Sequence, residues 1–302
     1  MTGAIHDLGY KRYLGTRRPQ STRWRVIMRH QLATAWKSEG RFKGWWRYKA
    51  WLGLSVMGLV VFAAVMYFWQ TKMVPMFGGG ADKVRWLDLA LPFAEDAFRT
   101  GAMFLTFTVG ASVIASDAQS GAFVFYFSRP VRPVDYLAGK VAAMVLLMAT
   151  LVALPLVLIA GLRVGLAGST HEMVDSLDLL PRALAVGLID SVAYAVVPLG
   201  ISALVQRPLH ALAAWAGYYL LIGSALAGAG AATGSPIGAL SLSTACSVVA
   251  NAIFDSPLPM VRRVLPPLGP SVASLVGHLV LALGLAYWRV RQAQRTGVGG
   301  GS

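Results

Sequence analysis

The sequence predicts an all-α integral membrane protein with six spanning helices. Its residues are 56% hydrophobic and only 13% charged, whereas a soluble domain carries about 25% charged residues. The apolar residues gather in runs close to the roughly 17–25 residues that a helix needs to cross a bilayer core. Because these runs take up most of the 302 residues, we expect one membrane domain at residues 50–288 and no separate soluble domain.

Six apolar runs are long enough to span, and the basic residues orient them. Of the 27 Lys and Arg residues, 19 fall in segments that would share one side with both termini. Basic residues favour the cytoplasmic side, so we expect a multi-pass protein of the cytoplasmic (inner) membrane with both termini in the cytoplasm, including a tail at residues 289–302. The spans are expected at about residues 50–70, 97–116, 141–162, 183–206, 209–232 and 271–288.

Residues 1–49 are basic and aromatic. Trp24, Met28, Leu32 and Trp36 recur every four residues among arginines, which predicts an amphipathic helix lying in the plane of the lipid headgroups. A net charge of +14 would favour nucleic acid as the partner of a soluble protein. A bilayer-length run follows this segment at once, so we expect membrane lipids as its partner and no nucleic acid.

Residues 233–270 contain the one ambiguous run. Residues 237–254 carry no formal charge and are long enough to cross, but a seventh span would place the basic tail outside, against the charge bias. The run is rich in Ser and Thr and is followed by several prolines. We therefore expect a re-entrant pair of short helices on the outer face, where irregular backbone can be buried in protein.

The loop at residues 117–140 is the most informative stretch. It contains charged residues and prolines that could not lie in lipid. It also contains four aromatic residues, Phe123, Phe125, Tyr126 and Phe127. Aromatic rings beside arginines indicate either a docking surface for a soluble partner or an interfacial aromatic belt next to a basic turn.

Three strings within this loop carry a resemblance. They read Asp117-x-x-x-Gly121, then Ser128-Arg129-Pro130-Val131-Arg132-Pro133, then Tyr136-Leu137-x-Gly139-Lys140. Together they resemble the cytoplasmic coupling loop of ABC transporter permeases of the type-2 exporter family. The likeness is specific over this loop. Elsewhere it consists of the order of the spans and the basic, aromatic N-terminus.

The resemblance implies a permease subunit that forms a translocation pathway, is expected to export, and works as a homodimer. Its N-terminal amphipathic helix would be the elbow helix before the first span. A separate cytoplasmic ATPase would dock on the loop and would bind the ATP and Mg, so this chain itself would be no enzyme and would hold no cofactor or metal. The residues expected to couple it to the ATPase are Asp117, Gly121, Phe123, Phe125, Tyr126, Phe127, Arg129 and Arg132.

The fifth apolar run is rich in small residues, among them Gly217, Gly223, Ala225 and Gly228. Small residues let membrane helices approach closely. In the resembled family the first and fifth spans meet their symmetry mates, so these four residues are candidates for the dimer interface. Packing within one monomer is the alternative.

Asp190 is the only carboxylate expected well inside a span. A buried charge there is costly, which indicates either a contact in the substrate pathway or a hydrogen bond to Ser191, Tyr194 or another helix. The sequence has no phosphate-binding G-x-x-x-x-G-K-[ST] string and no H-E-x-x-H string. A membrane scaffold or sensor, or a membrane-embedded enzyme centred on Asp190, remain alternative functions. The transported substrate stays open between drug, lipid, peptide, polysaccharide and ion.

Overall fold

The computed structural model describes residues 22–36, 44–73, 76, 82–128, 131–255 and 265–296. Every element in these ranges is helical, and none is a strand. Both expected cytoplasmic ends lie partly outside them, at residues 1–21 and 297–302. The predicted all-α class is confirmed, and so is the number of helical stretches long and apolar enough to cross a membrane. These six are Tyr48–Met73, Leu91–Gln119, Pro133–Gly165, Thr170–Leu204, Pro208–Thr233 and Leu268–Arg295.

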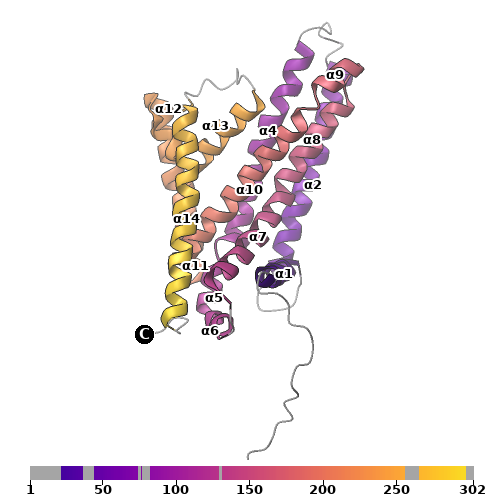
Figure 1. Cartoon of the computed structure of the whole chain (residues 1–302). Helices are drawn as coiled ribbons and strands as arrows, with labels where there is room; N and C mark the ends of the chain where they lie inside the picture. The colour runs from indigo at the N-terminus through magenta and orange to yellow at the C-terminus, as the bar shows by residue number, and fades with distance from the viewer. Residues whose placement is uncertain are drawn as a thin grey trace, which may run out of the picture.

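The long helices run side by side, and α1 crosses beneath them at the lower end (Figure 1). Several stretches combine two or three successive elements, because short π-helical segments or breaks interrupt them. The first half of the chain contains α1 (Arg23–Trp36), α2 (Gly44–Phe68), η2 (Trp69–Met73), α4 (Asp82–Leu105), η3 (Thr106–Gly110), α5 (Val113–Gln119), α6 (Ala122–Phe127) and α7 (Pro133–Leu151). The second half contains α8 (Ala153–Gly165), α9 (Thr170–Asp175), α10 (Leu179–Leu204), α11 (Pro208–Ala216), η4 (Gly217–Gly223), α12 (Ser224–Thr233), η5 (Pro236–Leu240), α13 (Leu242–Phe254) and α14 (Leu268–Thr296).

Helix α10 forms the centre of the bundle and packs against α7, α8 and α14. Two glycines allow this close packing. A Cβ on Gly187 would lie 2.4 Å from the Cα of Ala153 in α8, and a Cβ on Gly200 would lie 2.6 Å from the Cα of Ala282 in α14. By contrast, α2 and the α11–α12 stretch expose most of their apolar side chains. Their exposed surface therefore requires lipid or another protein.

The second spanning stretch is broken between η3 and α5, and its neighbours satisfy the freed backbone groups. Ser202 Oγ of α10 accepts hydrogen bonds from the backbone N–H groups of Ile114 and Ala115, at 3.1 and 3.0 Å. Trp215 Nε1 of α11 donates to Thr106 Oγ1 at 2.7 Å. Backbone groups in a membrane must find partners inside the protein, so this break is locked to α10 and α11.

Residues 236–254 form two short helices, η5 and α13, and neither is long enough to cross a membrane. The expectation that this run is not a seventh span is therefore confirmed, while its re-entrant placement stays a prediction. Helix η5 packs closely against α12. Glycine at residue 230 permits this approach, since a Cβ there would lie only 2.6 Å from the Cα of Gly238. Residues 256–264, within the expected re-entrant region, lie outside the described residues.

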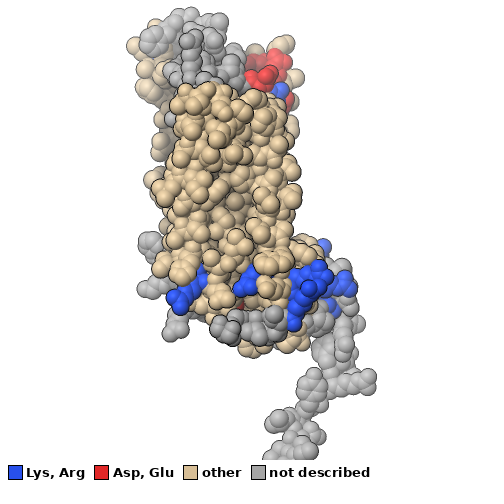
Figure 2. Space-filling model, turned by 90° about the vertical axis from the view of Figure 1, so that its left-hand side faces the viewer, with Lys and Arg blue, Asp and Glu red and all other residues tan. Residues whose placement is uncertain are grey.

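Charge is separated along the long axis of the molecule. On the face that Figure 2 shows, Lys and Arg lie at the lower end, Asp and Glu with a smaller basic patch lie at the upper end, and the surface between them carries no charge. The upper acidic group includes Glu172 and Asp175 in α9 and Asp178 before α10. An uncharged belt between two charged ends is the distribution that a membrane-spanning bundle requires.

Candidate functional site

The loop at residues 117–140 comprises the end of α5, all of α6 and the start of α7, and α5 and α6 meet at Gly121. This residue has a positive φ of 68°, a left-handed conformation that costs a residue with a Cβ roughly 1–2 kcal/mol. The glycine four residues after Asp117 is therefore required by the backbone. It sets the angle at which α6 leaves α5. A Cβ added to Gly121 would meet no other atom within 4 Å, so the glycine is needed for its backbone conformation and not for close packing.

Asp117 is bound inside the protein. Its Oδ2 accepts a hydrogen bond from Tyr136 Oη at 2.6 Å and lies 2.7 Å from Lys140 Nζ. Lys140 Nζ also donates to Gln31 Oε1 of α1 at 2.8 Å. The Lys140 side chain is only 3% exposed, so this ion pair is little screened by water. Together the four side chains tie α5, α7 and α1 to one another.

Gly139 is the place where α1 rests on α7. A Cβ there would lie 2.7 Å from both the Cβ of Ile27 and the carbonyl oxygen of Trp24. The face of α1 that packs on the bundle contains Ile27 and Ala35, which are buried. Of the predicted stripe, Leu32 packs on the core, Trp24 and Met28 are half-buried, and only Trp36 is exposed.

The aromatic residues of α6 do not form one exposed surface. Phe123 is only 4% exposed, stacks on Phe127 at 5.9 Å and meets Tyr136 edge-on at 5.6 Å. Tyr126 is half-buried against Tyr136, and its burial, together with the charge of Asp117, raises its pKa to about 12. The prediction that all four rings are available to a partner is therefore wrong for Phe123, because it fills the space between α6 and α7. Phe125, in contrast, is 74% exposed.

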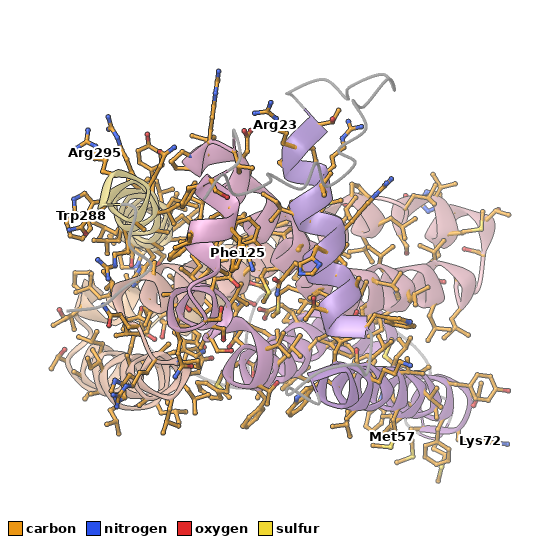
Figure 3. The ribbon with its side chains drawn as sticks, turned by 90° about the horizontal axis from the view of Figure 1, so that it is seen from below. Arg23, Met57, Lys72, Phe125, Trp288 and Arg295 are labelled. Carbon is orange, nitrogen blue, oxygen red and sulfur yellow. The ribbon has the colours of Figure 1, made fainter. Side chains whose placement is uncertain are left out.

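The exposed residues among the described part of the loop include Val124, Phe125, Arg132 and Val134. We call these four residues the lower face. Seen from below, Phe125 lies between α1 and the end of α14 that carries Arg295 (Figure 3). Arg129, the second arginine expected to contact the ATPase, lies outside the described residues.

A second group of polar residues lies inside the bundle. Arg99 Nη1 is 2.5 Å from Glu95 Oε1, and Arg99 also pairs with Asp96. Glu95 and Arg99 are buried. The expected second span, residues 97–116, left out Glu95, whereas the helical stretch Leu91–Gln119 that is long and apolar enough to span includes both residues of this pair. The spacing Glu95-x-x-x-Arg99 was the missed signal, because side chains four residues apart can neutralise each other on one helix face.

Asp190 faces this ion pair and is 1% exposed. Within the described part of the chain, neither of its carboxylate oxygens accepts a hydrogen bond. The two partners considered from sequence are engaged elsewhere, since Ser191 Oγ donates to the Gly187 carbonyl and Tyr194 Oη pairs with Tyr219 Oη. Instead, the groups that interact with Asp190 come from other helices. They are Arg99, Glu95 and Asp96 of α4 and Cys246 of α13.

Asp190 is therefore not a solitary acid, and the expectation that no second carboxylate shares its depth in the membrane is also wrong. Asp190 lies 11 residues after the start of the 26-residue α10, or about 16 Å along its axis at 1.5 Å per residue. That position is near the middle of the helix. We call Glu95, Arg99 and Asp190 the buried cluster.

A cavity of about 580 Å³ adjoins the buried cluster. Asp96 and Arg99 lie on its wall, opposite the hydroxyl-bearing side of α13, where Ser243, Thr244 and Ser247 contribute. Gly223 and Gly228, two of the candidates for the dimer interface, also line this cavity. The other two candidates do not: Gly217 is half-buried and Ala225 is exposed.

The arrangement combines an open cavity, lined by both polar and apolar residues of α4, α12 and α13, with an anchored loop at the lower end of the bundle. Among the described residues, no group of three or more His, Cys, Asp or Glu side chains is placed to hold a metal ion. The chain matches no model of a known protein family and no curated protein.

Proposed function

We propose that this chain is the permease subunit of an ABC transporter, with its six spans forming an export pathway together with a second copy. A separate cytoplasmic ATPase would dock on the lower face and supply the energy. The observation that supports this most is the loop itself. Three of its signature residues, Asp117, Tyr136 and Lys140, bind one another inside the protein, and this leaves Phe125 and Arg132 exposed beside an anchored base.

The connections of the loop suit the transmission of force. Helix α5 continues α4 through η3, and Ser202 fixes its start to α10. Helices α4 and α10 carry the buried cluster and one wall of the cavity. A displacement of α6 by a partner would therefore reach the residues beside the cavity through packed helices and not through a flexible link.

In this proposal the basic lower end lies in the cytoplasm of a cell with an inner membrane, and the acidic upper end lies outside. Helix α1 acts as the elbow helix in the headgroup layer, where its exposed Trp36 and nearby basic residues meet lipid. Helices η5 and α13 form the re-entrant region towards the outer face.

The second copy would contact the stretches that a single chain leaves uncovered. Val60 and Val61 of α2 are 60% and 56% exposed, and Leu221 of η4 is 72% exposed. The small residues at Gly217 and Ala225 would let helices of two copies approach closely there. Lipid would cover whatever part of these surfaces the dimer leaves open.

The docking proposal predicts that the double variant Phe125→Glu, Arg132→Glu retains little ATPase. Each residue is exposed, so the change should alter folding by no more than about 0.5 kcal/mol. At an interface it would remove an aromatic contact and introduce two negative charges, which can cost several kcal/mol of binding. We expect co-purification of the ATPase with the variant to fall at least about tenfold, the equivalent of 1.4 kcal/mol.

The control is Arg182→Glu, which makes the same charge reversal at the upper end, where Arg182 forms a partly exposed pair with Asp178. It should retain the ATPase. If the double variant holds the ATPase as well as the parent does, the lower face is not the docking surface. If the parent itself retains no nucleotide-hydrolysing subunit, a scaffold or sensor becomes the better explanation of the loop.

The orientation can be tested with single cysteines in a Cys246→Ala background. Val174 in α9 is 59% exposed at the upper end, and Gln294 near the end of α14 is exposed at the lower end. In intact cells, an impermeant thiol reagent should label Val174→Cys and should label Gln294→Cys only after lysis. Labelling of Gln294→Cys in intact cells would contradict a cytoplasmic lower end.

A further inference from the structure

We propose that Glu95 and Asp190 form a carboxyl pair that binds one proton within the membrane-spanning bundle, beside the cavity. The proposal goes beyond the transporter assignment and does not depend on whether an ATPase docks on the lower face. It rests on the geometry of the buried cluster.

The first argument is the unpartnered carboxylate of Asp190. Both of its oxygens are buried, and neither lies at hydrogen-bonding distance from a described N–H or O–H donor, while the neighbouring Cys246 thiol is only a weak donor. Buried polar groups in native proteins almost always have a partner. The Glu95 carboxyl group lies within interaction range of Asp190, but two ionised carboxylates can only accept hydrogen bonds. A single proton between them turns one carboxyl group into a donor and satisfies the other.

The second argument is the balance of charge. Arg99 is the one cation within the buried cluster, whereas Glu95 and Asp190 supply two carboxyl groups. Asp96 also pairs with Arg99, but its side chain is 68% exposed and can be hydrated. With one proton bound, the buried cluster is neutral. Without it, an uncompensated negative charge would be buried in the bundle, which is strongly unfavourable.

The other helices that pack on α10 bring no competing charge to this place. Lys140 of α7 is paired with Asp117, Arg163 of α8 with Glu172, and His278 of α14 with Tyr218. On α10 itself, Tyr194 follows Asp190 by one turn and pairs with Tyr219. Cys246 of α13 completes the surroundings of Asp190. The proton is therefore the ligand that this set of groups can bind without a further partner.

Arg99 connects the proton site to the cavity, because it belongs to the buried cluster and also lines the cavity wall. Binding or loss of the proton changes the net charge beside the cavity by one unit. When the proton is present, one of the two carboxyl groups beside Arg99 is neutral, so an anion in the cavity meets less negative charge there. Occupancy of the cavity and occupancy of the proton site are thereby coupled.

Infrared difference spectroscopy of the purified chain, without nucleotide or partner, tests the proposal directly. As the pH is stepped from neutral to alkaline, a range in which exposed carboxyl groups are already ionised, the parent should lose the carbonyl stretching band of a protonated carboxylic acid, and this band should shift in D₂O. Glu95→Gln and Asp190→Asn should each abolish the band, because the single remaining carboxylate is balanced by Arg99. Asp96→Asn is the matched control, since it removes the exposed partner of the same arginine and should keep the band.

Thermal unfolding would show which variants are folded, and either amide variant alone suffices if the other does not fold. The proposal is overturned if the parent shows no such band at any pH at which it is folded. It is also overturned if the band persists in the folded amide variants. Neither result would bear on ATPase docking, so failure of this inference and failure of the transporter proposal can be told apart.

Discussion

Replacement of Arg99 by leucine is expected to reduce the stability of the folded protein more than any other single change in the bundle. Arg99 is 1% exposed and holds Glu95 at 2.5 Å, with Asp190 beside them. Removing one partner of a buried ion pair typically costs about 3–5 kcal/mol, because the other partner remains buried without compensation. We therefore expect a large loss of folded protein in detergent and a lower midpoint of thermal unfolding.

Two further variants make this measurement specific. Arg182→Leu removes an arginine with the same i,i+4 relation to an acid, but this pair is partly exposed, with side chains 34% and 51% accessible. Such pairs contribute about 0–1 kcal/mol. The double variant Glu95→Gln, Arg99→Leu should recover much of the lost stability, because only Asp190 then needs to be neutral. Equal stability of Arg99→Leu and Arg182→Leu would contradict the buried cluster.

The buried cluster also shows where sequence reasoning reached its limit. The six spanning stretches follow from the length and polarity of apolar runs, because every backbone group in a bilayer must be satisfied within a helix. The same criterion ends a span near the first charged residues, so the expected span at residues 97–116 left out Glu95 and gave Arg99 no partner inside it. A charge is tolerated inside when a partner on the same or a neighbouring helix neutralises it. Asp190 lies 91 residues after Arg99 in the sequence, so only the packing of α10 against α4 shows that the two residues are neighbours.

The prediction for the loop at residues 117–140 was incomplete for a different reason. Its composition correctly marked it as a non-spanning segment, but composition could not tell which aromatic rings point inward. Once Gly121 fixes the start of α6, helical geometry places Phe123 and Phe127 on one face and Phe125 on another. The inner face packs on Tyr136. The register of a six-residue helix depends on the residue where it begins, and here that residue is a single left-handed glycine.

The role of the motif residues differs from the one that the resemblance implied. Asp117 and Gly121 were expected to couple the chain to an ATPase, and Gly139 was part of the motif that carried the resemblance. The structure places each of them in the architecture of the loop, as an ion pair, a backbone corner and a helix contact. A short motif can be specific because it builds a platform, while the contacts to a partner come from neighbouring exposed residues such as Phe125.

Replacement of Lys140 by methionine is expected to have the second largest effect and to act on the lower end of the molecule. The Lys140 side chain is buried, and its Nζ contacts Asp117 Oδ2 at 2.7 Å and Gln31 Oε1 at 2.8 Å. Methionine keeps the length of the side chain but removes both contacts. We expect a loss of about 3 kcal/mol, the lower end of the range for a broken buried pair, because Asp117 is 18% exposed and water can reach it.

The site of the damage distinguishes this variant from a general loss of stability. Lys140 is the residue through which α7 holds both α5 and α1, so α1 should become more sensitive to limited proteolysis than the upper helices are. Asp117→Asn keeps an oxygen that can accept from Tyr136 and Lys140, but it leaves the buried charge of Lys140 uncompensated, so we expect a loss of similar size, about 3 kcal/mol. Arg291→Met, which removes an exposed charge from α14, should leave α1 as protected as in the parent.

Combining Asp117→Asn with Lys140→Met tests whether the pair acts as a unit. If the ion pair carries the effect, the double variant should be more stable than the sum of the single losses predicts, because no uncompensated charge remains. Under the proposed docking of an ATPase on the lower face, its co-purification should fall in Lys140→Met, since Phe125 and Arg132 would lose the base that positions them. Additive losses, with α1 as protected in Lys140→Met as in the parent, would show that the loop is held by its apolar packing on Tyr136 and not by this ion pair.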